Sequence, residues 1–80
     1  MDTIENTLVN LTSKYSDANP VHLDLNLKTD LGLDSLSLTE LIVACEDEFS
    51  IEIDMDHPDT INAKTLRDLY NGVVLLVDSN

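Results

Sequence analysis

Asp34 and Ser35 are the pair of residues best placed in this sequence to take part in chemistry. They follow Gly32 and precede a largely apolar run, so Ser35 is expected at the exposed start of a helix that Asp34 caps. A phosphate joined to such a serine would lie near unpaired backbone N–H groups and the positive end of the helix dipole, which favour an anion. His22 and His57 lie in other segments, so no nearby base would activate the serine. The sequence therefore predicts an exposed hydroxyl that a modifying enzyme can reach, and the alternative is that Ser35 only helps to cap the helix, worth about 1 kcal/mol.

Four helical segments are expected to position this pair. Apolar residues at helical spacing predict helices over about residues 3–15, from Leu36 to about Ser50, and after Thr65. Pro58 suits the first turn of a short helix between the last two. These segments predict an all-α fold, with residues 1–80 forming one domain: a small four-helix bundle with a long first loop and a short third helix.

Local details refine these helices. Asp2 and Glu5 form a possible capping box for the first helix. Residues 16–33 form a long loop, in which three alternating leucines are expected to anchor the loop in the core: Leu23, Leu25 and Leu27. Gly72 lies inside the last helix and is expected to weaken it by about 1 kcal/mol relative to alanine.

The charge is strongly acidic and unevenly distributed. Sixteen acidic and four basic residues give a net charge of −12, which repels nucleic acid and anionic lipid. Between Lys28 and Lys64 there is no Lys or Arg. The same stretch holds ten acids: Asp30, Asp34, Glu40, Glu46, Asp47, Glu48, Glu52, Asp54, Asp56 and Asp59. They could form a solvated surface, but their concentration favours a docking face for basic proteins.

Cysteine usage and hydropathy indicate the compartment. Cys45 is the only cysteine, so no intramolecular disulfide can form, and its spacing from Leu41 and Phe49 predicts a buried thiol. No apolar run is long enough to cross a bilayer, and no basic-then-apolar signal pattern begins the chain. A cytoplasmic protein without membrane insertion is expected, and the two unpatterned histidines predict no metal site.

The segment from Asp30 to Leu36 reads Asp-Leu-Gly-Leu-Asp-Ser-Leu and resembles the signature of acyl carrier proteins, the phosphopantetheine-dependent carrier family. Glu40 and Leu41 one turn later, and the acidic run ending at Phe49, continue the resemblance. It covers about residues 27–71 closely and the first helix by architecture only.

The resemblance implies a carrier rather than an enzyme. A phosphopantetheinyl transferase would attach a 4′-phosphopantetheine arm to Ser35 through a phosphodiester, and the thiol of the arm would hold an acyl group as a thioester. Asp34 would meet basic residues or metal-bound phosphates of the transferase. The carrier would then act as a monomer that visits acyl-transferring, condensing and modifying enzymes with basic docking surfaces.

The resemblance also assigns two groups of binding residues. The expected partner-binding residues on the outward face of the second helix are Leu36, Glu40, Val43, Glu46 and Asp47. The expected lining of an acyl pocket inside the bundle is Leu38, Leu41, Ile42, Cys45, Ile53, Ile61 and Leu66, and ordinary core packing is the alternative for each.

Other functions stay open beside fatty acid synthesis. Ser37 stands where many relatives carry an acid, which fits a dedicated carrier for a polyketide, a modified lipid or an amino acid. An aminoacyl or peptidyl carrier, and a non-catalytic acidic protein that docks basic partners, are the alternatives. A Gly-Asp-Ser-Leu hydrolase is excluded by Leu33 in place of the glycine and by the short chain, and an EF-hand by Pro58 in the acidic linker.

Overall fold

The computed structural model describes residues 3–54 and 56–79. Its helices are α1 (Thr3–Ser13), α2 (Ser35–Phe49), α3 (Pro58–Ile61) and α4 (Leu66–Ser79). Within the described ranges no strand forms, and an isolated antiparallel bridge joins Asn26 to Thr65. The predicted all-α class is confirmed. The bundle itself consists of three long helices, because α3 is a single four-residue turn.

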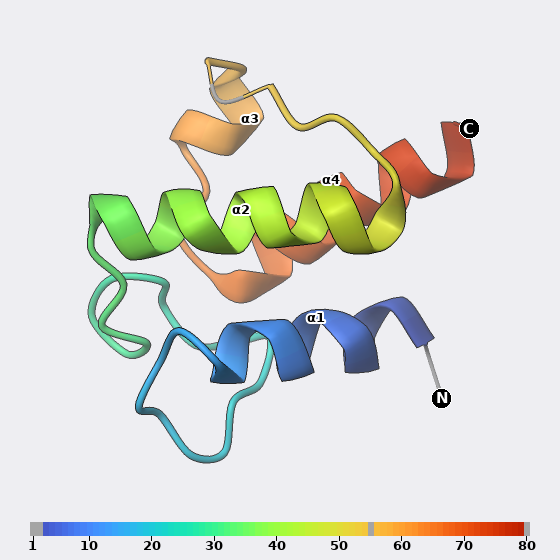
Figure 1. The fold of residues 1–80 in the computed structure, drawn as a ribbon. Coiled ribbons are helices and arrows are strands. Elements are labelled where there is room, and N and C mark those ends of the chain that lie inside the picture. The colour runs from blue at the N-terminus through green and yellow to red at the C-terminus, as the bar shows by residue number, and fades with distance from the viewer. Residues whose placement is uncertain (1–2, 55, 80) are drawn as a thin grey trace.

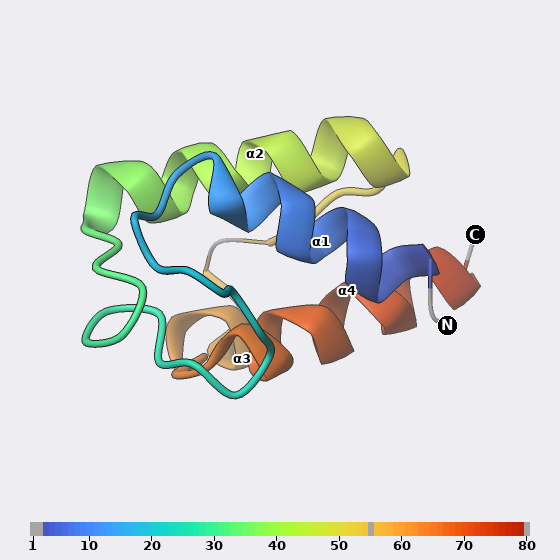
Figure 2. The ribbon, with the colours of Figure 1, turned by 90° about the horizontal axis from the view of Figure 1, so that it is seen from below.

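The three long helices pack against one another in every pairing, and α3 packs against α4 (Figures 1 and 2). Helix α1 ends at Ser13, two residues before the predicted boundary, because the N–H groups of Lys14 and Tyr15 bond three residues back, to Leu11 and Thr12. The predicted capping box involves Asp2, which lies outside the described residues. Helix α3 begins at Pro58, as the sequence predicted.

The core lies between α1, α2 and α4 and includes side chains from the long loop. Leu8, Leu41, Leu66 and Val73 are fully buried, as is Cys45. Burial, and secondarily the charge of Glu46, raises the pKa of the Cys45 thiol to about 12. The predicted buried thiol is therefore confirmed, and it stays protonated at neutral pH. Core burial of this kind supplies the main driving force for folding.

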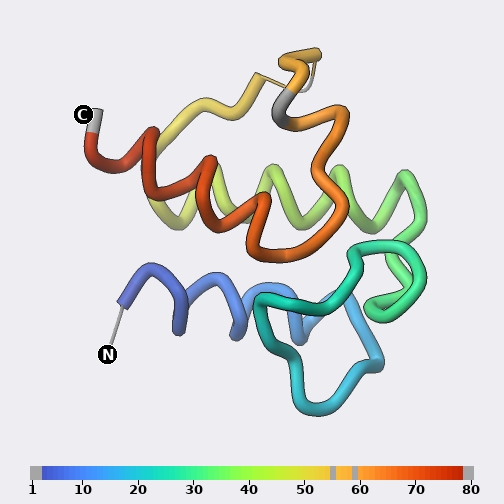
Figure 3. Tube along the Cα trace, turned by 180° about the vertical axis from the view of Figure 1, so that it is seen from behind, coloured from blue at the N-terminus to red at the C-terminus, as the bar shows by residue number. Residues whose placement is uncertain are grey.

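The long loop is fastened to the beginning of α4. Leu23 and Leu27 are buried, which confirms them as core anchors, and Leu25 is half-buried. The loop also has a backbone partner that the sequence did not reveal, since the N–H of Leu27 donates to Lys64 at 2.8 Å and the N–H of Leu66 donates to Leu25 at 3.0 Å. Figure 3 shows this loop beside the start of α4. The pairing was missed because residues 64–66 have no strand-like alternation.

Helix α4 begins with a reciprocal cap. A carboxylate oxygen of Asp68 accepts from the N–H of Lys64 at 2.8 Å and of Thr65 at 3.1 Å, and the N–H of Asp68 donates to the Thr65 hydroxyl at 3.4 Å. These bonds, first from Lys64 and then from Thr65, hold the pKa of Asp68 below its ordinary value.

Acid is expected to weaken the fold partly through Asp68. Its pKa is lower in the folded than in the unfolded chain, so the carboxylate stabilises the fold above the unfolded pKa, and this stabilisation is lost as pH falls through the folded pKa. In Asp68→Asn, the free energy of unfolding should therefore fall by less than in wild type as the pH is lowered from about 5 to about 2. Urea unfolding at several pH values across this range measures the free energy of unfolding of both proteins. Asp17→Asn, at an exposed loop position, should keep the wild-type dependence.

Helix α2 ends at a strained cap. Ser50 has φ 55° and ψ 48°, in the left-handed region, and its N–H donates to the carbonyl of Glu46, as does the N–H of Ile51 at 3.1 Å. Glycine adopts this conformation without steric cost, whereas serine does not.

Ser50→Gly is therefore expected to stabilise the protein, by about 0.5–1 kcal/mol. The change in the urea midpoint at constant m-value measures this gain. Ala44→Gly, in the middle of α2, should destabilise it by a similar amount. A loss of stability in Ser50→Gly would contradict the strained-cap interpretation.

Candidate functional site

Side-chain hydrogen bonds close the loop that leads to α2. The side-chain oxygen of Asn26 accepts from the N–H groups of Lys28 and Thr29 at 2.9 and 3.0 Å. A carboxylate oxygen of Asp30 accepts from the N–H of Asn26 at 2.8 Å. These bonds satisfy the turn locally, and so the residues that follow begin from a defined position.

Two buried leucines then hold the approach to the helix. Leu31 and Leu33 are both buried, and Gly32 between them has φ +69°, which glycine adopts without strain. The N–H of Leu33 donates to Leu27 at 3.0 Å, and the Ser16 hydroxyl donates to the carbonyl of Leu31 at 2.7 Å. With Leu33 held in the core, the next residues emerge at the surface.

Asp34 caps α2, as the sequence predicted. Its backbone is extended, and its Oδ1 accepts from the N–H of Ser37 at 2.7 Å. Hydrogen bonds from Ser37 hold the pKa of Asp34 below its ordinary value, so the carboxylate is ionised at neutral pH. Ser35 is the first residue of α2 and is exposed.

The surroundings of Ser35 fit a phosphodiester. Ser35 is exposed, and among the described residues no hydrogen bond occupies its hydroxyl. The first turn of α2 offers backbone N–H groups and the positive end of the helix dipole. Asp34 already uses one of these donors, which leaves the N-terminus a weaker but still favourable site for an anion.

The outward face of α2 is mixed apolar and acidic. Leu36 is 68 % and Val43 50 % exposed, and Glu40 and Asp47 are exposed as well. Glu46 does not fit the predicted outward position: it is half-buried, and its Oε2 accepts from the N–H of Ile53 at 2.9 Å. The helix turns this position toward the chain that leaves α2, where a backbone donor needs a partner.

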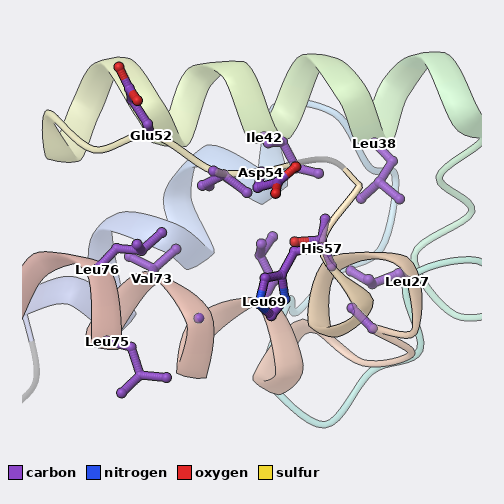
Figure 4. Close-up of a pocket in the computed structure, with 14 residues that line it drawn as sticks. Leu27, Leu38, Ile42, Glu52, Asp54, His57, Leu69, Val73, Leu75 and Leu76 are labelled. Carbon is purple, nitrogen blue, oxygen red and sulfur yellow. The ribbon is translucent and has the colours of Figure 1, made fainter.

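A cavity of about 240 Å³ lies between α2, α4 and the segment that joins α2 to α4. In Figure 4, Leu38 and Ile42 approach it from α2, and Leu69, Val73 and Leu76 belong to α4 on the opposite side. Three of the seven predicted pocket residues line it: Leu38, Ile42 and Ile53.

The other four predicted pocket residues lie elsewhere. Leu41, Cys45 and Leu66 are fully buried in the core but do not line the cavity. Ile61 is 66 % exposed and lies outside it. The prediction is therefore wrong for these four in this cavity: Leu41, Cys45 and Leu66 follow the alternative of ordinary core packing, and Ile61 is largely exposed to solvent.

Most of the lining was not predicted. The additional lining residues are Leu27, Glu52, Asp54, His57, Thr60, Ala63, Leu69, Gly72, Val73, Leu75 and Leu76. The apolar stripe of α4 could have suggested its members, whereas nothing in the local sequence marks the linker residues.

The described residues form neither a metal site nor a membrane-spanning helix. In residues 3–54 and 56–79, no group of three His, Cys, Asp or Glu side chains is arranged to hold a metal ion. None of the described helices has the length and apolar character that spanning a membrane requires.

Comparison with known proteins identifies the family of the chain. Residues 4–73 match the family model described as "Phosphopantetheine attachment site". The chain is 37% identical over 81 residues to an acyl carrier protein of Helicobacter hepaticus, covering 100% of this chain and 99% of that protein. It is 56% identical over 39 residues to an acyl carrier protein of Nitratidesulfovibrio vulgaris, covering 49% of this chain and 51% of that one.

A solved structure from Mycobacterium tuberculosis, assigned as an acyl carrier protein, superimposes with a TM-score of 0.80 and 33% identity. The alignment covers 91% of this chain and 97% of that one. Fold and family model together define a small helical domain of the class that bears phosphopantetheine. The chain belongs to the acyl carrier protein family, whose members are carriers and not enzymes.

Proposed function

We propose that this chain carries acyl intermediates as thioesters on a 4′-phosphopantetheine arm attached to Ser35. It shuttles them between enzymes of fatty acid, polyketide or related lipid biosynthesis in the cytoplasm. The observation that carries the proposal is the exposed Ser35 at the first position of α2, directly after the Asp34 cap. When bound, the arm supplies the terminal thiol that forms the thioester.

The role of the chain at Ser35 is to present a hydroxyl. A phosphopantetheinyl transferase supplies the base and the coenzyme A, since the described residues place no histidine at the serine. The arm's phosphate gains from the N-terminal dipole of α2. The ionised Asp34 remains available at the surface to meet basic residues or metal-bound phosphates of the transferase.

The mixed face of α2 serves as the docking surface for partner enzymes. Leu36 and Val43 supply apolar contact, and the exposed Glu40 and Asp47 meet basic side chains at the rim. Rim charges speed association and leave it sensitive to salt, which suits a monomeric carrier that visits many enzymes. Glu46 contributes less, because one of its oxygens already binds Ile53.

The cavity is the place for the acyl chain. Its lining is mainly aliphatic, with polar groups from Glu52, Asp54, His57 and Thr60 on the linker side. An apolar space with few polar groups matches a hydrocarbon better than an amino acid, whose amine would lose its hydration. The cavity therefore supports an acyl cargo over an aminoacyl cargo.

Intact mass tests the proposal. The unmodified chain is incubated with coenzyme A and a broad-specificity phosphopantetheinyl transferase, and it should gain the mass of one phosphopantetheine. A folded and unmodified chain that gains no mass would contradict the carrier function and favour an acidic protein that docks basic partners directly.

A further inference from the structure

Gly72 is a residue of low helix propensity inside the amphipathic helix α4. It lies inside α4, between the buried residues Leu69 and Val73 along the chain, and a glycine there weakens the helix relative to alanine. The backbone does not require it, because among the described glycines only Gly32 has a positive φ. Close packing does not require it either, since a Cβ at position 72 would have no heavy atom within 4 Å.

The open space beside Gly72 is the cavity. Gly72 borders it together with Leu69, Val73 and Leu76 of the same helix. At about 100° per residue, position 72 lies roughly 60° from Leu69 and 40° from Leu76 around the axis, so a side chain there would share their face. Asn71 is exposed, lies on the far side of α4 and does not line the cavity.

The volume of the cavity indicates the size of its cargo. An apolar protein cavity of about 150 Å³ accepts benzene, which has six carbon atoms. By this comparison, 240 Å³ accommodates about eight to ten carbon atoms. A leucine side chain adds four carbons, so at position 72 it would leave room for about four to six.

We infer that Gly72 is a specificity-determining residue: the side chain missing at this position sets the length of acyl chain that the carrier shelters, about eight to ten carbons. The inference rests on the proposed function, because it requires an acyl group on the arm at Ser35. The glycine lowers the stability of α4 at a position where neither the backbone conformation nor the packing excludes a side chain. The absence of a side chain there keeps the cavity open.

The experiment measures how cargo length changes thermal stability. Wild type, Gly72→Leu, Gly72→Ala and Asn71→Leu are loaded by the transferase from acyl-coenzyme A of every length from about four to fourteen carbons, a range that brackets the estimate. Intact mass verifies loading, and Tm is measured for each product. A chain that enters the cavity binds the folded state only, so Tm rises with length until the cavity is full.

In wild type and Asn71→Leu, the rise in Tm should stop at about eight to ten carbons, and in Gly72→Leu at about four to six. Gly72→Ala should raise the Tm of the unloaded chain. It should also shorten by about one carbon the acyl length at which the rise in Tm stops. If Gly72→Leu does not fold, Gly72→Ala alone tests the inference. The inference would be overturned if substitution at position 72 left unchanged the acyl length at which the rise in Tm stops. It would also be overturned if the Tm of the loaded wild type did not depend on acyl length. Wild type that accepts no acyl group by mass would instead overturn the proposed function, and the inference with it.

Discussion

Replacing Ser35 with alanine is expected to abolish loading completely, so that the intact mass stays at the unmodified value after incubation with coenzyme A and the transferase. The reason is chemical, since alanine offers no oxygen for the phosphodiester. The fold should persist, because Ser35 is exposed and the cap of α2 comes from Asp34. Circular dichroism of the variant verifies this, so that a missing mass gain reports on the site alone.

Ser37→Ala is the matched control for Ser35→Ala. Ser37 lies two residues further along α2 and is half-buried. Alanine retains its backbone N–H, which donates to Asp34 at 2.7 Å, and removes only the hydroxyl, which makes the smaller contribution to lowering the pKa of Asp34. This variant should load as the wild type does. A mass gain that survives in Ser35→Ala and disappears in Ser37→Ala would move the attachment point to Ser37 and refute the assignment.

Leu41→Ala is expected to be the most destabilising of the stability variants, by about 2–5 kcal/mol. Leu41 is 0 % exposed and lies in the core cluster that joins α2 to α1 and α4, so its truncation leaves a void that the packed neighbours fill only in part. Domains are typically stable by roughly 0.05–0.15 kcal/mol per residue, so this loss is a large part of the whole for a chain of 80 residues.

Val43→Ala is the control for Leu41→Ala on the same helix. Val43 is 50 % exposed, so its truncation should change the free energy of unfolding by less than about 1 kcal/mol. Urea unfolding followed by circular dichroism measures both variants. A loss below about 1 kcal/mol in Leu41→Ala would show that the core relaxes around the void, and the packing described for α2 would then be wrong.

The sequence by itself determined the features that depend on neighbours along the chain. The all-α class, the Asp34 cap with Ser35 behind it and the burial of Cys45 follow from spacings of one to four residues, whereas the outward position of Leu36 and Val43 came from the resemblance to carrier proteins. Such spacings decide hydrogen bonds within a helix and the face on which a side chain lies. The resemblance of residues 30–36 to carrier proteins added the family, which the comparisons confirmed.

Only the tertiary structure decided which distant segments meet. Glu46 binds the N–H of Ile53 because the chain reverses after α2, and Leu25 and Leu27 bond to the start of α4 across about forty residues. The cavity is the clearest case, since Leu41 and Ile42 are both buried but only Ile42 borders it. Local patterns identify which side chains leave water, whereas the relative placement of α2 and α4 decides where their packing leaves a space.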